Sequence, residues 1–309
     1  MSSGFKGPSP RTWRPKEEEE LIKHIVEACP TEGSWVEAGE DDAAVLPDGT
    51  VVNFDAMTRS RHVPKELKDR DLGWKFVASV VSDVGAMGGE PSFFGFSVCL
   101  DDEVDVEQLI LGISEGLREF GTSLVGGDIV EGDELALSGT CLGKLKGEPL
   151  LMSNARPGDL VAVTGPLGGP NAFVRAILNG LKLEETLYER FARPRPPVEV
   201  GVELARSGYR VAVTDISDGL LAEAEAIARR SGVAIEIYAW EVPVDEGVRE
   251  IARRLGVNPV DLALEGGEDY EFLICGPEDV IEEFDLTTIG RVTEGDGVRV
   301  VRDTRARYE

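Results

Sequence analysis

Short apolar runs alternate with longer segments of helical periodicity along most of the chain. The runs rich in β-branched residues and bounded by turn residues predict strands at 51–56, 134–145, 159–165, 210–215, 233–239 and 270–276. Apolar residues spaced three and four apart predict helices at 17–28, 71–87, 105–120, 171–180 and 219–231. Strands that alternate with helices in this way indicate an α/β fold.

The length of 309 residues favours two domains over one. A turn-rich stretch at 146–159 precedes a new strand, so we place the boundary there, with an N-terminal domain at 17–148 and a C-terminal domain at 149–309. Residues 1–16 have no apolar core, so we expect a disordered tail rather than a signal peptide. No apolar run reaches the roughly 18 to 20 residues that cross a bilayer, so we expect no membrane association.

The charge of the chain excludes one class of partner. Its 58 acidic and 32 basic residues give a net charge of -26, which argues against binding nucleic acid. The four cysteines, Cys29, Cys99, Cys141 and Cys275, lie far apart and form no CxxC pair, so neither a zinc site nor a disulfide scaffold is expected. A reducing cytoplasm fits this cysteine usage.

Aspartates follow apolar runs at several places in the chain. The recurring positions are Asp55, Asp83, Asp128, Asp215 and Asp218, and Asp41 and Asp42 precede another apolar segment. One such aspartate is explained equally well by a turn or a helix N-cap. Several carboxylates that converge repel one another and need a counter-charge, which Mg²⁺ supplies in sites that bind nucleotide phosphates. The pattern therefore predicts phosphoryl chemistry.

The familiar nucleotide-binding loops are missing from this sequence. Residues 139–144 (GTCLGK) have one residue too few between their glycines to be a P-loop, and Leu145 follows them. Residues 165–169 (GPLGG) do not match GxGxxG. We interpret both segments as turns.

Ordered motifs over almost the whole chain resemble the thiamine-monophosphate kinase family. This family belongs with aminoimidazole ribonucleotide synthetase and selenophosphate synthetase to one superfamily. The matching segments include EDDAAVL (40–46), GWKFVASVVSDVGAMGGEP (73–91), LVGGDIV (124–130), VTDISDGL (213–220) and LEGGEDYEF (264–272).

The resemblance implies a two-domain α/β (α+β) fold like that of aminoimidazole ribonucleotide synthetase. The N-terminal domain would carry a mixed or antiparallel sheet, bind ATP and Mg²⁺, and form the interface of a homodimer; the C-terminal domain would be α/β. The implied reaction is direct in-line transfer of the γ-phosphate of ATP onto thiamine monophosphate, giving thiamine diphosphate. Because the acceptor phosphate is already ionised near neutral pH, no general base is required.

The resemblance also assigns roles to single residues. The metal-binding positions are Asp42, Asp55, Asp83, Asp128, Asp215 and Asp218. The ATP-binding positions are Gly127, Asp128 and Ser217, and the substrate-binding positions are His62, Glu268 and Tyr308. Asp269 and Glu271, next to Glu268, are interpreted as structural or exposed.

The chain departs from the family pattern at several positions. Glu40 stands where the family usually has glycine, and Ile129 and Val130 replace a pair of threonines. Asn53 and Phe54 replace hydroxyl residues before Asp55. A basic residue that reaches ATP aligns with Met152, with Lys144 and Arg156 as possible substitutes. We expect these departures to affect metal and nucleotide affinity more than the acceptor site.

Two alternatives to this kinase remain open on the sequence. One is a related ATP-dependent enzyme with another substrate, although the Pro-Arg-Ile-Cys tail of hydrogenase-maturation factors and the N-terminal Cys of selenophosphate synthetase are both missing. The other is a non-catalytic dimer that binds nucleotide or thiamine phosphate, which the departures at the nucleotide and metal positions suggest.

Overall fold

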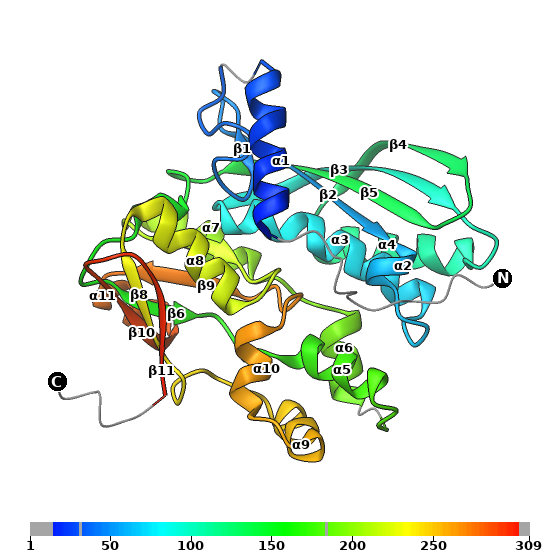
Figure 1. The fold of residues 1–309 in the computed structure, drawn as a ribbon. Helices are drawn as coiled ribbons and strands as arrows, with labels where there is room; N and C mark the ends of the chain where they lie inside the picture. The colour runs from blue at the N-terminus through cyan, green and yellow to red at the C-terminus, as the bar shows by residue number, and fades with distance from the viewer. Residues whose placement is uncertain (1–14, 31–32, 183–184, 303–309) are drawn as a thin grey trace. The chain divides into compact units, whose positions relative to one another are not determined.

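The computed structural model describes residues 15–30, 33–182 and 185–302. The chain divides into two compact units (Figure 1). The first unit is Met1–Val84 with Gly89–Leu145, and the second is Gly85–Gly88 with Lys146–Glu309. Each unit has a mixed β-sheet of its own, which confirms the expected fold of two α/β units.

The sheet of the first unit has five strands. They are β1 (Ala44–Val45), β2 (Thr50–Thr58), β3 (Gly89–Leu100), β4 (Ser123–Glu131) and β5 (Ala136–Leu145). Their order is β1-β2-β5-β3-β4, and β3 and β4 are parallel while the other neighbours are antiparallel. Strand β4 is an edge strand, and all nine of its residues are exposed.

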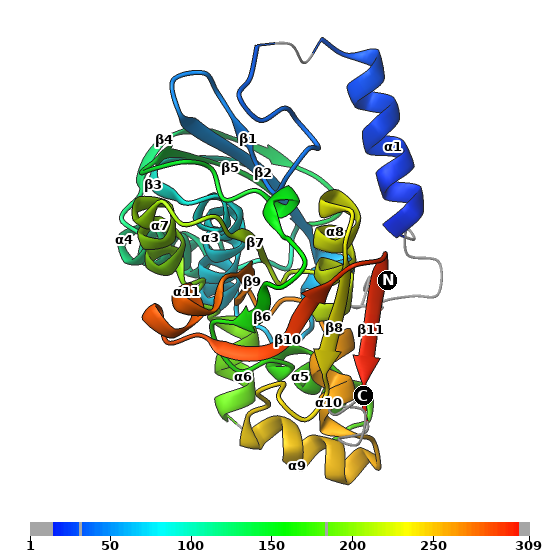
Figure 2. The ribbon, with the colours of Figure 1, turned by 90° about the vertical axis from the view of Figure 1, so that its left-hand side faces the viewer.

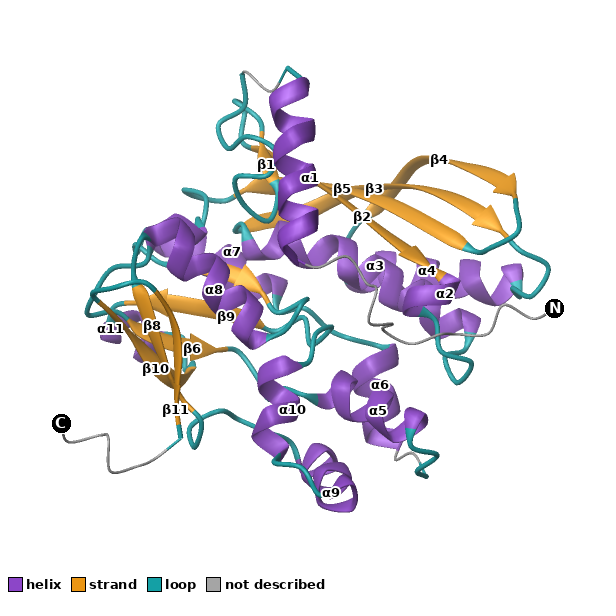
Figure 3. Cartoon of the chain, viewed as in Figure 1, coloured by secondary structure: helices purple, strands orange, loops and turns teal. Residues whose placement is uncertain are grey.

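Helices cover one face of this sheet (Figure 3). The helices of the first unit are α1 (Pro15–Ala28), α2 (Arg59–His62), α3 (Asp69–Ala86) and α4 (Val106–Glu119). A Cβ added to Gly139 of β5 would lie 2.7 Å from the side chain of Val80 and 2.8 Å from that of Phe76, so α3 rests directly on the sheet. A Cβ on Gly112 of α4 would lie 1.7 Å from the carbonyl oxygen of Arg70, so α3 and α4 cross in backbone contact.

The opposite face of the first sheet is not covered by helices of its own unit. Strand β2 alternates between buried and exposed positions, so Phe54 points away from α3. Phe54 is 72% exposed, and Phe93 and Val130, which the strand register places on the same face, are 49% and 52% exposed. We call the face that carries Phe54, Phe93 and Val130 the open face.

The sheet of the second unit has six strands. They are β6 (Leu160–Val163), β7 (Ala212–Asp215), β8 (Ala234–Tyr238), β9 (Phe272–Gly276), β10 (Thr287–Thr293) and β11 (Gly297–Val301). Their order is β11-β8-β10-β6-β9-β7, with β11 and β8 parallel and the other pairs antiparallel (Figure 2). Every residue of β7 and β9 is buried, as expected for strands that are covered on both faces.

The second unit has eight helical elements in its described residues. They are η1 (Met152–Asn154), α5 (Gly169–Leu178), α6 (Glu185–Ala192), α7 (Val198–Ser207), α8 (Leu220–Ser231), α9 (Glu246–Leu255), α10 (Pro259–Glu265) and α11 (Glu278–Glu283). Leu204 of α7 and Ile281 of α11 share one buried cluster with Val213, Phe272 and Ile274 of the sheet. Helix α8 contacts β7, β8, β9 and β11. The core of this unit is therefore closed around its sheet.

The predicted strands and helices are confirmed, with ends that shift by a few residues. Strands β3 and β4 were not predicted. The predicted tail, residues 1–16, lies outside the described residues except for Pro15 and Lys16, which begin α1. Among the described residues, no helix is both long and apolar enough to cross a bilayer.

Candidate active site

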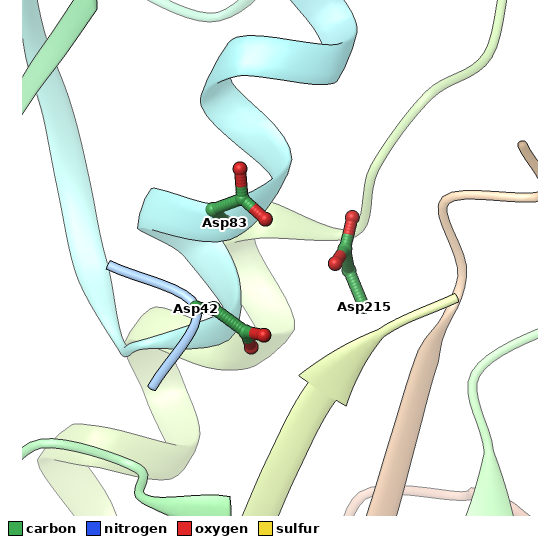
Figure 4. Close-up of side chains that lie close together, drawn as sticks. All are labelled: Asp42, Asp83 and Asp215. Carbon is green, nitrogen blue, oxygen red and sulfur yellow. The ribbon is translucent and has the colours of Figure 1, made fainter. Parts of the chain in front are cut away.

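Two predicted metal ligands come together in the first unit. Asp83 lies in the last turns of α3, and Asp42 lies in the turn before β1. Each offers a carboxylate oxygen, and the two oxygens lie within 4.8 Å of each other (Figure 4). Two carboxylates at this separation repel unless a cation lies between them. Oxygen ligands of this kind suit Mg²⁺.

Asn53 holds Asp83 in place. Its side chain, on β2, is 6% exposed. Its Nδ2 donates to the carbonyl oxygen of Val80 at 3.1 Å and also to Oδ2 of Asp83. The sequence comparison marked Asn53 only as a departure from the family pattern and missed this role. The available signal was a polar residue at a buried position of an alternating strand.

The acidic turn before β1 is ordered by its own side chains. The carboxylate of Glu40 accepts the backbone N–H of Glu37 at 3.0 Å, and that of Asp41 accepts the N–H of Asp42 at 3.1 Å. Glu40 therefore closes the turn, where the family usually has glycine. Asp41 supports the turn, and Asp42 is the member that approaches Asp83.

The structure places Asp55 and Asp128 on opposite faces of the first sheet. Asp55 pairs with Gly139, whose Cβ position faces α3. Asp128 pairs with Ser97, in the row next to the one that contains Asp55, so it points to the open face. Within one chain, Asp128 therefore does not join the face of the sheet that carries Asp55.

Gly127 fits the strand for a steric reason. A Cβ on this residue would lie 2.2 Å from the carbonyl oxygen of Phe96 on the neighbouring strand. Glycine thus lets β4 approach β3 closely next to the predicted ATP contact at Asp128. This steric role is independent of any nucleotide.

His62 ends the short helix α2 at the end of β2. Its Nδ1 accepts the backbone N–H of Thr58 at 3.0 Å, an arrangement that leaves the ring proton on Nε2. Arg59 of the same helix pairs with Asp101, which also accepts the N–H of Leu135 at 3.0 Å. These contacts fix the helix that carries the predicted substrate contact.

In the second unit, the predicted metal and ATP residues share the loop from β7 to α8. Asp215, also drawn in Figure 4, ends β7 and is 2% exposed, while Asp218 is exposed. The backbone N–H of Asp218 donates to Oε1 of Glu223 at 3.1 Å, and the side chain of Ser217 also bonds to Glu223. Burial and the negative charge of Asp215 raise the pKa of Glu223 to about 8. Glu223 was not predicted as a site residue.

Glu268, the predicted substrate contact, lies in a loop with an unusual backbone. Its φ is 65°, and Tyr270 has a φ of 53°, both in the left-handed region that side-chain-bearing residues rarely adopt. The N–H of Glu268 donates to the carbonyl oxygen of Ser217 at 2.7 Å. The structure thus joins the predicted acceptor contact to the predicted ATP contact within one unit.

Asp269 and Glu271 are held by interactions that confirm their structural interpretation. Both carboxylate oxygens of Asp269 accept the N–H of Gly168 at 3.0 Å. Oε2 of Glu271 accepts the hydroxyl of Thr164 at 2.7 Å, and Oε1 lies 3.5 Å from Nη1 of Arg190. Burial raises the pKa of both acids, for Asp269 well above its ordinary range. Neither residue is exposed.

A cavity of ≈ 610 Å³ lies beside these acids in the second unit. Asp269 and Glu271 line it together with Asp245 and with Arg190, Arg193 and Arg195 from α6 and the segment after it. Its volume falls in the range of small-molecule sites. Groups of both charge signs meet there.

The remaining predicted positions are accounted for as follows. Met152 is buried, and Arg156 is exposed. Nζ of Lys144 lies 3.4 Å from a carboxylate oxygen of Asp48 in the first unit. Tyr308 lies outside the described residues, so its predicted role stays a prediction.

Comparisons with known proteins agree with this arrangement. Two family descriptions match: AIR synthase related protein, N-terminal domain, at residues 40–145, and AIR synthase related protein, C-terminal domain, at 156–303. The chain is 88% identical over 309 residues to thiamine-monophosphate kinase of Methanopyrus kandleri, with 100% of both chains covered. It is 32% identical over 272 residues to thiamine-monophosphate kinase of Aquifex aeolicus, with 85% of this chain and 88% of that protein covered.

Solved structures give the same result. The structure described as "AaThiL complexed with AMPPCP and TMP" has a TM-score of 0.81 and 31% identity, and the match covers 95% of this chain and 97% of that one. A HypE-HypF complex has a TM-score of 0.77 but 21% identity, so it shares the fold alone. The chain therefore belongs to the thiamine-monophosphate kinase family, within the AIR synthase related proteins.

Proposed function

We propose that this chain transfers the γ-phosphoryl group of ATP onto the phosphate of thiamine monophosphate, giving thiamine diphosphate. The observation that carries the proposal is the identity of 88% over the full length to the Methanopyrus kandleri thiamine-monophosphate kinase. The bond between the loops of Ser217 and Glu268 supports it, because a phosphoryl transferase must hold donor and acceptor side by side.

The residues that would hold Mg²⁺ are Asp42, Asp55 and Asp83 of the first unit, with Asp215 and Asp218 of the second. The separation of at most 4.8 Å between the oxygens of Asp42 and Asp83 fits a cation bridge. When bound, Mg²⁺ would neutralise the charge of the ATP phosphates during transfer. The protein's own contribution is to fix the carboxylates in advance, as Asn53 does for Asp83.

The acceptor would be held by His62 and Glu268. The Nδ1 bond of His62 to Thr58 directs the Nε2–H outwards as a donor, which suits a phosphate oxygen. The carboxylate of Glu268 suits a cationic or amino-bearing ring such as that of thiamine. Because the acceptor phosphate is already ionised, these residues orient it without removing a proton.

A homodimer completes the proposal. The open face and strand β4 expose apolar residues, including Phe54, Phe93 and Val130, in an arrangement that a second copy of the chain would cover. Asp128 also points to the open face. We therefore assign the sixth metal position to Asp128 of the partner subunit. The free thiols of all four cysteines support a cytoplasmic location.

Release of ADP tests the proposed function. The purified chain with ATP and Mg²⁺ should release ADP when thiamine monophosphate is added, and thiamine diphosphate should form in equal amount. Nucleotide binding without turnover would favour a non-catalytic binding protein. Turnover that is indifferent to thiamine phosphates would favour a related enzyme with another substrate.

A further inference from the structure

Two loops of the second unit form one hydrogen-bonded body. We call residues 215–219 the nucleotide loop and residues 266–271 the acceptor loop, after their proposed ligands. The N–H groups of Glu268 and Tyr270 donate to the carbonyls of Ser217 and Ile216 at 2.7 and 3.0 Å, and the N–H of Ile216 donates back to Glu271 at 2.7 Å. A Cβ on Gly267 would lie 2.2 Å from the carbonyl oxygen of Ser217. The loops therefore touch along their backbones.

Each loop is also held from its far side by a different buried acid. Glu223, in the first turn of α8, is 9% exposed and binds the backbone of Asp218 and the side chain of Ser217. It reaches the nucleotide loop alone: both residues that it contacts precede Gly219, where the chain turns with a φ of 113°. Glu223 thus closes a turn whose side chains face the proposed ligands.

Asp269 plays the corresponding part in the acceptor loop. Its two bonds to the N–H of Gly168 tie the loop to the start of α5, a segment 101 residues away in the chain. It stands between Glu268 and Tyr270, the two residues with left-handed backbones. Such conformations persist where the surroundings fix them, and the bonds of Asp269 to Gly168 do so here.

We propose that Glu223 and Asp269 are positioning residues with separate tasks: Glu223 sets the nucleotide loop, and Asp269 sets the acceptor loop. Neither residue needs to touch a substrate. Both act through backbone N–H groups, so an acceptor oxygen at the right place matters and the negative charge does not. The proposal rests on the proposed kinase activity for the names of the two ligands.

The test is a crossed comparison of two Michaelis constants. Glu223→Ala should raise KM for ATP about tenfold and change KM for thiamine monophosphate less than about twofold. Asp269→Ala should do the reverse. Glu223→Gln and Asp269→Asn keep a carbonyl acceptor, so each should recover most of the loss. Glu236→Gln, which breaks a surface pair with Arg291 on another strand, should leave both constants within about twofold.

Milder variants cover the case in which the alanine variants do not fold. Glu223→Asp and Asp269→Glu move the carboxylate by one methylene and should give the same crossed pattern at smaller size. A thermal unfolding curve of each variant shows whether it is folded. Equal shifts of both constants in either variant, or amide variants as poor as the alanine variants, would overturn the proposal.

A direct binding measurement separates this proposal from the proposed function. If the wild-type chain does not phosphorylate thiamine monophosphate, the proposed function fails. Titration with the ATP analogue AMPPCP then decides the inference: Glu223→Ala should weaken that binding about tenfold, and Asp269→Ala should not. Equal effects of the two variants on AMPPCP binding would overturn the inference as well.

Discussion

The two sheets of this protein differ in how completely they are covered. In the second unit, β7 and β9 are buried at every residue, and the core closes around them. In the first unit, one face of the sheet exposes Phe54 and Phe93, and the edge strand β4 has no buried residue. Large exposed apolar groups on a sheet face and edge mark an interaction surface.

The difference indicates a division of tasks. The second unit is finished by its own chain, so its two ligand loops can be fixed by internal bonds such as those of Asp269 and Glu223. The first unit keeps a surface for a second chain and places Asp128 on it. Its own metal ligands, Asp42 and Asp83, lie on the covered side.

The largest effect is expected at the covered side of the first unit. Asp83→Asn removes a charge from the pair with Asp42, so we expect turnover at limiting Mg²⁺ to fall about 100-fold or more. Part of the loss should return at high Mg²⁺. ADP release across a range of Mg²⁺ concentrations, together with Mg²⁺ binding by calorimetry, checks this.

Asp48→Asn is the matched control for this prediction. The Asp48 side chain is 69% exposed and pairs with Lys144, and it lies in the same unit. It should change neither turnover nor Mg²⁺ binding. Near-normal turnover of Asp83→Asn at limiting Mg²⁺ would contradict the proposed metal role.

The next largest effect is expected at the open face. Phe54→Asp places a charge where a partner chain would cover an aromatic ring, so we expect the dissociation constant of the dimer to rise at least about 30-fold. Light scattering across a dilution series measures it. Leu178→Asp is the control, because Leu178 is 56% exposed on α5 of the second unit. A chain that is monomeric before mutation, or equally affected by both changes, would remove the contrast between the units.

A third effect concerns the core of the second unit. Arg210 donates to both carboxylate oxygens of Asp159, at 2.8 and 2.6 Å, and Asp159 is 4% exposed. Asp159→Ala leaves the guanidinium without this partner, so we expect a loss of about 3 kcal/mol in the free energy of unfolding. Chemical denaturation measures the loss. Glu250→Ala, which breaks an exposed pair with Arg253, should cost less than about 0.5 kcal/mol.

The smallest effect contrasts the pH response of two acids, one from each unit. Burial alone would raise the pKa of Asp101, but hydrogen bonds from Arg59 and Leu135 outweigh it and hold the pKa below its ordinary value. Its stabilising contribution is therefore present above about pH 4 and is lost as the pH falls through the lowered pKa. Asp101→Asn should flatten the acid side of the stability curve.

Glu271 should respond with the opposite sign. Burial raises its pKa, so the native state binds its proton more tightly than the unfolded chain does. Stability is then lost as the pH rises from about 4 through the raised pKa, and Glu271→Gln should flatten that slope. Melting temperatures of both variants from acid to neutral pH check the two signs. Slopes of the same sign would contradict the assignment.

The sequence predicted those parts of the fold that have regular burial. The alternation of β2 and the helical period of α3 were visible, and so were aspartates at their ends such as Asp83 and Asp215. Strand β3 was missed because two register shifts interrupt its alternation. Strand β4 was missed because it has no buried residue and therefore no alternation to detect.

The site was predictable by residue type but not by orientation. Asp55 and Asp128 look alike in sequence, and only the strand register places them on opposite faces. Glu223 and Asp269 were missed as positioning residues because their main partners are backbone N–H groups. The partner of Asp269 lies far away in the chain, at Gly168. No pattern of side chains reports such a bond.

The exposed edge strand β4 also bears on how the chain is made. As an unpaired strand in a parallel pair, it forms only after β3 has folded, and it then offers its backbone to any other extended segment. Newly synthesised copies that wait for a partner would be open to mispairing and to proteases for longer at low expression levels. The yield of native protein should therefore depend on the rate of synthesis.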